Sequence, residues 1–112
     1  MDNFVARANI DHFLDLLQHD DISAERMSAI NKLLIGELNK LSRDNEQLEF
    51  AESRAARYRL HFDRLRDWRE GFPNGSADHI RAEMVLKTFE VTLLEMESFC
   101  IEMRKQVDGN AL

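Results

Sequence analysis

The sequence has 112 residues, of which 44% are hydrophobic and 32% are charged. A chain of this length forms one domain, residues 1–112, with a modest hydrophobic core. The net charge of −6 argues against a general binder of DNA or of membrane surfaces, because both attract proteins with a positive field. The single cysteine, Cys100, excludes an intramolecular disulfide and indicates a reducing compartment.

The composition also indicates the fold class and the compartment. One proline and four glycines are typical of a helical protein. Residues 1–11 contain neither a basic segment nor an apolar run, so no signal peptide is expected. No apolar stretch reaches the ~20 residues that a membrane span requires. We therefore expect a cytoplasmic, all-α protein with no membrane contact.

Two clusters of helix-breaking residues divide the chain. The first is HDDIS at 19–23, and the second is GFPNGS at 71–76, which holds the only proline. Ser23 and Ser76 are suited to cap the N-termini of the helices that follow them. The segments between the breakers predict three helices, at about residues 4–19, 24–70 and 77–106.

The middle segment carries a seven-residue repeat of apolar side chains. One heptad position holds Met27, Leu34, Leu41, Leu48, Ala55 and Phe62. Glu37 and Asp44 interrupt the partner position, so the repeat is imperfect near residues 42–45, and a break there is the alternative. Because the register is the same on both sides of that point, the pattern favours one continuous long helix.

The last predicted helix is apolar on two sides. One stripe is an unbroken heptad pattern, formed by Ala82, Leu86, Phe89, Leu93, Met96, Cys100, Met103 and Val107. A second stripe lies on roughly the opposite side and consists of Ile80, Met84, Val91, Leu94 and Ile101. A helix that is apolar on two faces needs a covering partner on each of them.

The helix lengths predict a homodimer. At ~1.5 Å per residue the long helix spans about 70 Å, and the two shorter helices, antiparallel to it, span about 24 and 45 Å. Such antiparallel hairpins give a cross-section of two helices at every level, which is too thin for a core. A second copy, with the long helices antiparallel, completes a four-helix-bundle-like assembly in which the first helix of one chain meets the third helix of the other.

Arginines concentrate in RYRLHFDRLRDWREG, residues 57–71. From Glu52 to Glu70 there are six arginines and four acids, so this stretch carries a net charge of only +2. Several of these arginines have an acid three or four residues away, which is typical of a solvated helix surface. Three have no such acid on their own helix and are candidates for binding an acidic protein partner or a phosphate: Arg54, Arg57 and Arg69. Nucleic-acid binding through the 54–69 arginines is a weaker alternative, because this stretch largely neutralises itself.

His61 is a candidate for phosphotransfer. A phosphorylatable histidine on a helix of a dimeric four-helix bundle is the arrangement used by histidine-kinase dimerisation domains and by phosphotransfer domains. The sequence HFDRLR lacks an acid or arginine directly after the histidine, and the chain has no nucleotide-binding glycine loop. A histidine at the edge of the core, half covered by a partner helix, is the favoured interpretation.

No residue pattern predicts an enzyme, a cofactor or a metal site. Di-iron bundles use Glu-x-x-His pairs, and no histidine of this chain has a glutamate three residues before it. His12, Asp15 and His19 share one helical side, but no fourth metal ligand is evident. Trp68 and Phe72, beside the turn at 71–76, form either a capping cluster or a partner-binding patch, and capping is favoured.

Two parts of the chain resemble patterns in short bacterial all-helical proteins of unassigned function. NIDHFLDLL at 9–17 and ERMSAINKLLIGELNKL at 25–41 are similar to an Asn-Ile-x-x-Phe-x-x-Leu-Leu helix followed by a helix containing Leu-Leu-x-x-Glu-x-x-Lys-Leu. The segment 64–104 is similar to a second pattern, built on Ala-x-x-x-Leu-x-x-Phe-x-x-x-Leu. Such proteins are often encountered around two-component signalling, so the resemblance implies a bacterial cytosolic helical protein and supplies no catalytic residue.

These features together predict a non-enzymatic, dimeric helical protein that acts through protein–protein interaction in bacterial signalling or regulation. The alternatives are histidine phosphotransfer through His61 and, more weakly, nucleic-acid binding. The candidate partner-binding residues are Arg54, Arg57, His61, Trp68, Arg69 and Phe72.

Overall fold

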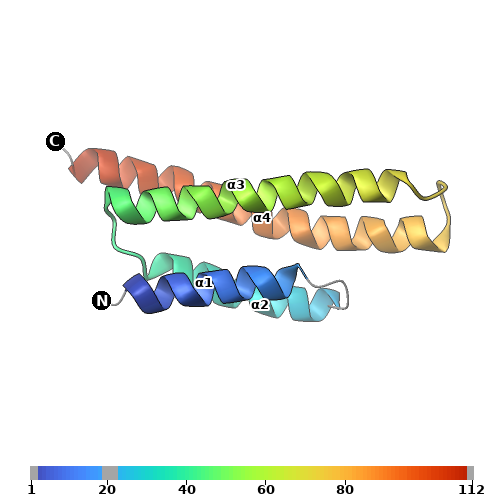
Figure 1. The fold of residues 1–112 in the computed structure, drawn as a ribbon, viewed down its shortest axis with the longest axis horizontal. Coiled ribbons are helices and arrows are strands. Elements are labelled where there is room, and N and C mark those ends of the chain that lie inside the picture. Colours follow the sequence, from blue (N-terminus) through green and yellow to red (C-terminus); the bar gives the residue numbers. More distant parts are fainter. Residues whose placement is uncertain (1–2, 19–22, 111–112) are drawn as a thin grey trace.

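The structure, a computed structural model, describes residues 3–18 and 23–110 and is all-helical, without strands, over these residues (Figure 1). Its helices are α1 (Asn3–Leu17), α2 (Ala24–Asn39), α3 (Asn45–Glu70) and α4 (Ala77–Asn110). None of these helices is both long and apolar enough to cross a membrane. The predicted end of the first helix at residue 19 lies outside the described residues.

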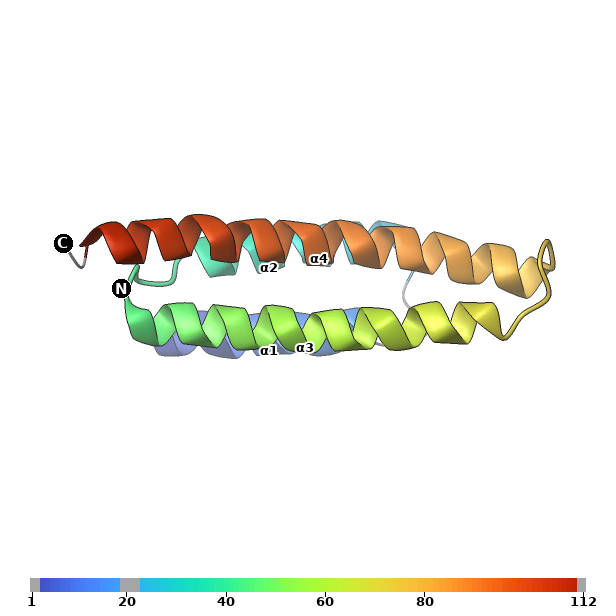
Figure 2. The same ribbon diagram turned by 90° about the horizontal axis from the view of Figure 1, so that it is seen from above.

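The helices form two hairpins that lie one over the other (Figures 1 and 2). α1 and α2 make one antiparallel hairpin, and α3 and α4 make a longer one. α1 packs on α2, α3 packs on α4, and α2 also packs on α4. α1 runs in the same direction as α3, and α2 in the same direction as α4. One chain therefore builds a four-helix cross-section by itself.

The prediction of a continuous helix over 24–70 is wrong, because the chain folds back at residues 40–44. Asp44 caps α3, since its Oδ1 accepts a hydrogen bond of 2.9 Å from the Gln47 backbone N–H. Ser42 is held by Asn3 of α1: the Ser42 N–H donates to Asn3 Oδ1 at 2.9 Å, and Asn3 Nδ2 donates to Ser42 Oγ at 3.0 Å. The three predicted helices thus become four.

This turn also removes the reason for the predicted homodimer. The two-helix cross-section assumed that the second and third helices were a single rod. Folding back at 40–44 lets the α1–α2 hairpin cover the α3–α4 hairpin within one chain (Figure 2). The homodimer stays a prediction, and it needs support from another feature of the molecule.

The hydrophobic core follows the predicted heptads. All six residues of the first repeat and all eight of the unbroken α4 stripe are buried, and α1 adds Ala6, Ile10, Leu14 and Leu17. The two predicted helix caps are also confirmed. Ser23 Oγ accepts from the Arg26 N–H at 3.2 Å, and Ser76 Oγ accepts from the His79 N–H at 3.1 Å.

The α3–α4 hairpin projects beyond the α1–α2 hairpin (Figure 1). α1 accompanies α3 as far as Tyr58, where Asp15 and Gln18 line one cleft together with Arg57 and Tyr58. Residues 61–87 continue past this point as two helices joined by a turn and are here termed the arm. In that turn Gly75 has a φ of 79°, a left-handed conformation that glycine adopts without steric cost.

Candidate functional site

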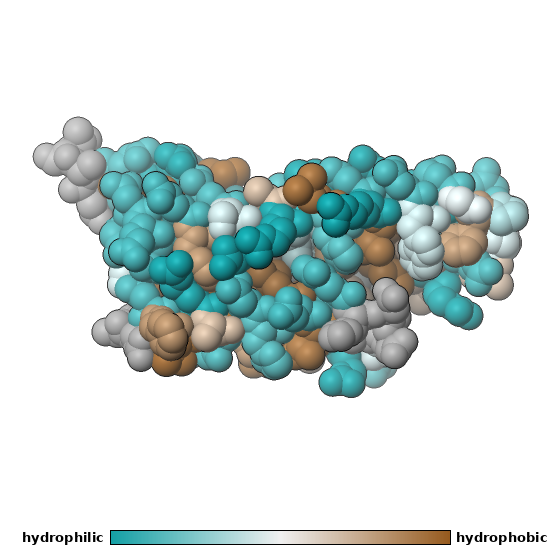
Figure 3. Space-filling model, in the orientation of Figure 1, coloured by the Kyte–Doolittle hydropathy of each residue, from teal (hydrophilic) through white to brown (hydrophobic). Residues whose placement is uncertain are grey.

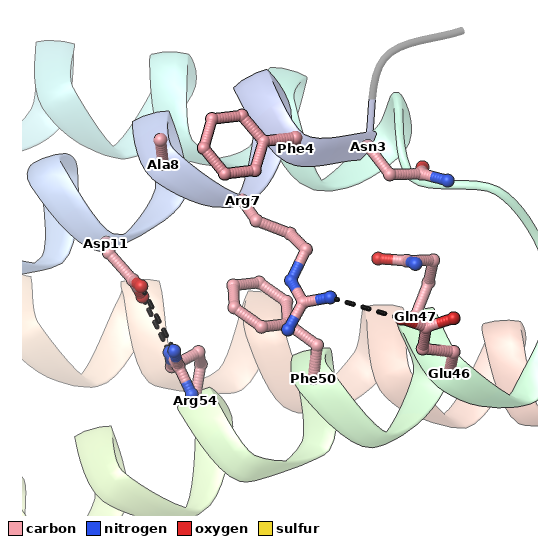
Figure 4. Close-up of a pocket in the computed structure, with 9 residues that line it drawn as sticks. All are labelled: Asn3, Phe4, Arg7, Ala8, Asp11, Glu46, Gln47, Phe50 and Arg54. Carbon is pink, nitrogen blue, oxygen red and sulfur yellow. Dashed lines mark hydrogen bonds and ion pairs between the residues drawn. The ribbon is translucent and has the colours of Figure 1, made fainter.

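Arg54 is fixed by an ion pair between α3 and α1 (Figure 4). Its Nε and Nη2 donate to the two carboxylate oxygens of Asp11 at 2.6 and 3.0 Å. Its guanidinium also lies 4.3 Å from the centre of the Phe50 ring. The hydrogen bonds to Asp11 raise the pKa of Arg54, so the guanidinium is charged whenever the chain is folded. Arg54 therefore joins two helices and is already occupied.

The same contacts line a cleft of about 650 Å³ between α1 and α3 (Figure 4). Arg7 lies 4.5 Å from the Phe50 ring centre and 3.6 Å from Glu46, so the two arginines of the cleft face two acids. Gln47 is only 4% exposed, and its Oε1 has no hydrogen-bond partner among the described residues. Because its charges neutralise each other, the cleft is suited to holding α1 on α3 rather than to binding an anion.

Arg69 is occupied as well. It has no acid three or four residues away on its own helix, but its Nη1 donates to Glu83 of α4 at 2.8 Å and its Nη2 to the adjacent Glu70 at 2.6 Å. Arg59 has Asp63 four residues further along its own helix, but it makes two hydrogen bonds of 2.7 Å with Glu97 of α4. An ion pair at helical spacing is present between Asp63 and Arg66, at 3.3 Å.

Arg57 differs from these arginines. Its side chain is exposed, and it makes no ion pair or hydrogen bond with any residue that the structure describes. It lines the cleft at the end of α1. Arg57, His61, Arg64 and Trp68 recur at four-, three- and four-residue spacing and therefore share one stripe of α3. This set is here termed the arm stripe.

His61 lies where the arm leaves the bundle. Its half-buried ring is 5.2 Å from the ring centre of Phe89, tilted by 48°. Phe89 also stacks on Tyr58 at 4.0 Å and lies 6.5 Å from Phe62. The imidazole thus belongs to an aromatic cluster between α3 and α4, and the expectation that a second chain half covers it is not needed to explain its burial.

Trp68 and Phe72 meet at the end of the arm. Their rings are 5.2 Å apart and nearly perpendicular, an edge-to-face contact. This contact lies at the C-terminal end of α3. It nevertheless leaves Trp68 48% exposed, so the ring also remains available to a partner.

The second apolar stripe of α4 is uncovered. α2 and α3 both lie on the inner side of this helix, and the eight residues of the other stripe are buried there (Figure 2). The outward residues each keep more than half of their surface exposed: Ile80, Met84, Val91, Leu94 and Ile101. They are here termed the outer α4 face. These five residues were not among the predicted binding residues. Their helical spacing in the sequence could have identified them as a binding surface.

The side of the molecule formed by α1 and α3 has a different character. It is mainly hydrophilic, with isolated hydrophobic patches (Figure 3). The exposed apolar residues Phe4 of α1 and Leu60 of α3 lie on different helices and form no stripe like that of α4. The two surfaces suited to binding proteins are therefore the arm stripe and the outer α4 face.

The described residues contain neither an activated cysteine nor a metal-binding cluster. Burial raises the pKa of the Cys100 thiol to about 11, and the nearby Glu52 and Glu97 act in the same direction. The described part of the chain contains no group of three His, Cys, Asp or Glu side chains that could hold a metal ion. His12 and Asp15 are described, whereas His19 lies outside the described residues.

Comparison of the chain with protein families, with curated proteins and with solved structures finds no match.

Proposed function

We propose that this chain is a non-enzymatic helical protein that acts by binding another protein through its arm, as a homodimer, in bacterial signalling or regulation. The observation that carries the proposal is the half-exposed Trp68 on an arm that extends past the rest of the bundle. Tryptophan is among the residues that contribute most binding energy in protein interfaces, because its large ring fills a pocket at small entropic cost.

The chemistry of the partner follows from the arm stripe. Arg57 and Arg64 are exposed and make no described ion pair, and Trp68 lies on the same stripe of α3. A partner that carries acids opposite the two arginines and an apolar pocket or side chain opposite Trp68 would complement this surface. An acidic amphipathic helix has both features.

The chain itself contains an example of such a contact. Arg54 lies one turn before Arg57 on nearly the same side of α3, and α1 covers it with Asp11. α1 ends near Tyr58, and the arm stripe continues beyond it. A partner helix bound to the arm stripe would therefore continue along α3 from the end of α1, with an acid on Arg64 as Asp11 is on Arg54. An acid at the near end of that helix would lie within reach of Arg57.

Photo-crosslinking tests this proposal. A photoreactive amino acid replacing Trp68 should form an adduct with a specific protein in cells of the native host, identified by mass spectrometry. The same amino acid at Glu49, an exposed position of α3 within the bundle, should not form that adduct. Equal adducts from both positions, or none from position 68, would contradict the proposal.

Charge variants test the chemistry of the partner. Arg57→Glu combined with Arg64→Glu should weaken binding of the captured protein by roughly tenfold or more, since each change replaces attraction by repulsion. Arg66→Glu is the matched control, because Arg66 is exposed on the same helix but outside the arm stripe. Arg66→Glu changes the net charge by half as much as the double variant, so a loss of half the binding free energy or more from it would show that only net charge matters.

Histidine phosphotransfer through His61 is the second candidate. It is favoured by the four-helix cross-section and by the partial exposure of the imidazole, and its packing against Phe89 weighs against it. Incubation with a phosphorylated response regulator should then give acid-labile phosphate on the chain that His61→Ala removes. Arm-stripe binding that survives His61→Ala, without acid-labile phosphate, would exclude this candidate.

Nucleic-acid binding through the 54–69 arginines has less support. Arg54, Arg59 and Arg69 each pair with an acid of another helix. Exchanging those acids for phosphates would cost the contacts between helices that these arginines make. The positive charge left for a phosphate backbone is therefore small, and the net charge of the chain is negative.

The helix lengths predicted the homodimer, but the feature that supports it is the exposed apolar side of α4. Over residues 3–18 and 23–110, the helices of the chain cover one of the two apolar sides of α4 and leave the other exposed. Large exposed apolar patches on a folded protein are characteristic of interaction surfaces.

A further inference from the structure

The outer α4 face forms one continuous stripe. Its five residues recur at three-, four- and seven-residue spacing, and the exposed side chains of Lys87 and Ser98 occupy the intervening positions of the same stripe. α2 and α3 pack against the other side of the helix (Figure 2). A partner helix can therefore lie along the whole stripe without displacing any described element.

We infer that a second copy of this chain covers the outer α4 face, with its α4 antiparallel and with Val91 of both chains at the two-fold axis. The inference rests on the proposed homodimer and names its interface. Symmetric association is the commonest arrangement of soluble oligomers, and it requires a patch that is complementary to itself.

The spacing of the apolar residues gives this self-complementarity. Ile80 and Ile101 lie at almost equal distances before and after Val91 along the helix. In an antiparallel pair centred on Val91, Ile80 therefore faces the partner's Ile101. Met84 then faces the partner's Ser98, and Leu94 lies beside the aliphatic stem of the partner's Lys87. Moving the axis by one turn leaves Ile80 or Ile101 without an apolar counterpart.

The charges select the antiparallel orientation. A parallel pair in register would bring Lys87 against the partner's Lys87 and Lys105 against the partner's Lys105, both on the stripe itself. The antiparallel pair instead brings Lys87 to the level of the partner's Glu95 and Arg81 to that of the partner's Glu102, each twice by symmetry. Like charges approach at two kinds of position: Glu90 lies near the partner's Glu90, and Glu83 lies near the partner's Glu97. Glu83 and Glu97 are already paired with Arg69 and Arg59 of their own chain, which leaves Glu90 as the unpaired repulsion.

The exposed area is sufficient for a dimer of moderate affinity. Five large side chains, each more than half exposed, with the polar residues beside them, bury on the order of 500 Å² per chain, or roughly 1,000 Å² in total. That value is at the lower end for specific interfaces, so a dissociation constant in the micromolar range is expected. The dimer would leave both arm stripes uncovered.

Sedimentation velocity of the full chain tests the inference. Wild type should pass from monomer to dimer as its concentration rises to about 100 µM. Val91→Glu should remain monomeric throughout, with unchanged helicity. Leu60→Glu is the matched control, since Leu60 is 58% exposed on α3 and Val91 is 53% exposed on α4, and it should dimerise like wild type. A wild type that stays monomeric, or a control that loses dimerisation equally, would overturn the inference.

Two further measurements test the orientation. In a Cys100→Ala background, oxidation should link Val91→Cys to itself and should link an equal mixture of Ile80→Cys and Ile101→Cys across chains, whereas Leu60→Cys should stay unlinked. Glu90→Gln should tighten the dimer several-fold by removing the like-charge contact. Linking of Ile80→Cys alone to itself would show a parallel pair, and a weaker Glu90→Gln dimer would exclude this register.

Failure of this inference and failure of the proposed function give different results. If wild type stays monomeric while position 68 still captures a protein, the arm binds its partner without this dimer. If wild type dimerises through α4 and position 68 captures nothing, the interface is correct and the proposed role of the arm is wrong. Capture of a different protein by a photoreactive residue at position 91 would assign the outer α4 face to that protein instead.

Discussion

Tyr58 buries a hydroxyl group together with an aromatic ring at the centre of the α3–α4 contact. Its ring stacks on Phe89, and the residue is only 1% exposed. Burial raises the pKa of the Tyr58 phenol well above its ordinary value, and the nearby Thr92 hydroxyl acts in the opposite direction. The two hydroxyls nevertheless lack the geometry of a hydrogen bond, and neither has another partner among the described residues. The ring stabilises this contact, and the hydroxyl does not.

Tyr58→Phe should therefore keep or increase the stability of the fold. It retains the stacked ring and removes a buried oxygen, so the free energy of unfolding should stay unchanged or rise by up to about 1 kcal/mol. Tyr58→Ala, which removes the ring, should lower it by about 3 kcal/mol or more. Urea unfolding measures both values. A loss of more than about 1 kcal/mol for Tyr58→Phe would show that the hydroxyl forms a hydrogen bond in solution.

Glu37 is a buried carboxylate on α2 that faces two donors. Its Oε1 accepts from Asn9 Nδ2 of α1 at 2.5 Å, and its Oε2 is 2.5 Å from Lys40 Nζ. The hydrogen bonds from Lys40 and then from Asn9 lower the pKa of Glu37 below its ordinary value of 4.5, against the effect of burial. The folded state therefore binds this proton less tightly than the unfolded state does.

This difference predicts how stability depends on pH. The contribution of Glu37 is fully present above pH 4.5 and is lost as the pH falls through the lower pKa of the folded state. Glu37→Gln should therefore flatten the decline in the free energy of unfolding on the acid side of pH 4.5, measured by urea unfolding across that range. Lys40→Gln, which removes the largest cause of the shift, should flatten it in part. Wild type and Glu37→Gln curves that run parallel would contradict this account.

Among the elements, α4 could be predicted from the sequence and the α2–α3 boundary could not. All eight residues of the α4 heptad stripe are buried, because a regular apolar stripe determines which side of a long helix packs against the core. The equal register before and after residues 42–45 pointed to a single helix, but a short turn can join two helices without changing which positions are apolar. The overlooked signal was Asp44 three residues before Gln47, the spacing of an N-terminal cap.

The binding residues were harder to predict than the elements. Arg54 and Arg69 have no acid at helical spacing on α3, which made them candidates for a partner. Asp11 and Glu83 pair with them only because the fold brings α1 and α4 alongside α3. Ion pairs between helices depend on the topology and cannot be read from spacing within one helix. Arg57 has no described partner, although Asp15 and Gln18 near the end of α1 line the same cleft.

The cap of α3 gives a prediction for this boundary. Asp44→Ala should lower the free energy of unfolding by about 1 kcal/mol, because the Gln47 N–H loses its acceptor at the start of the helix. Asp44→Ser should restore most of that loss, since serine accepts the same hydrogen bond. Urea unfolding compares the three proteins. An Asp44→Ser variant as unstable as Asp44→Ala would show that the negative charge near the helix N-terminus, rather than the hydrogen bond, is what matters.

At the scale of the whole molecule, the observed bundle and the long-helix dimer predicted from the sequence both place the first two helical segments against an α3–α4 hairpin, within one chain or between two. In the bundle, the turn at 40–44 lets the α1–α2 hairpin pack on its own α3–α4 hairpin. If that turn became helical, the α1–α2 hairpin would lie too far away and would have to pack on a second chain. Such exchange is a known consequence of changes in hinge loops. The residues of the turn therefore determine whether the four-helix bundle forms within one chain or between two chains.

Replacing the turn with helix-forming residues should convert the monomer into an exchanged dimer. The variant combines Ser42→Ala, Asp44→Ala and Asn45→Ala, which removes the α3 cap and the Ser42 side-chain contact with Asn3 and raises helix propensity across the turn. It is made in the Val91→Glu background, so that association through the outer α4 face does not contribute.

Sedimentation velocity should show a dimer for this variant and a monomer for Val91→Glu alone, with equal or greater helicity by circular dichroism. Ser23→Ala in the same background, which removes the cap of α2 but leaves the turn intact, should remain monomeric. If the variant stays monomeric and is only less stable, the turn is maintained by the packing of the two hairpins. The residues of the turn would then not determine it.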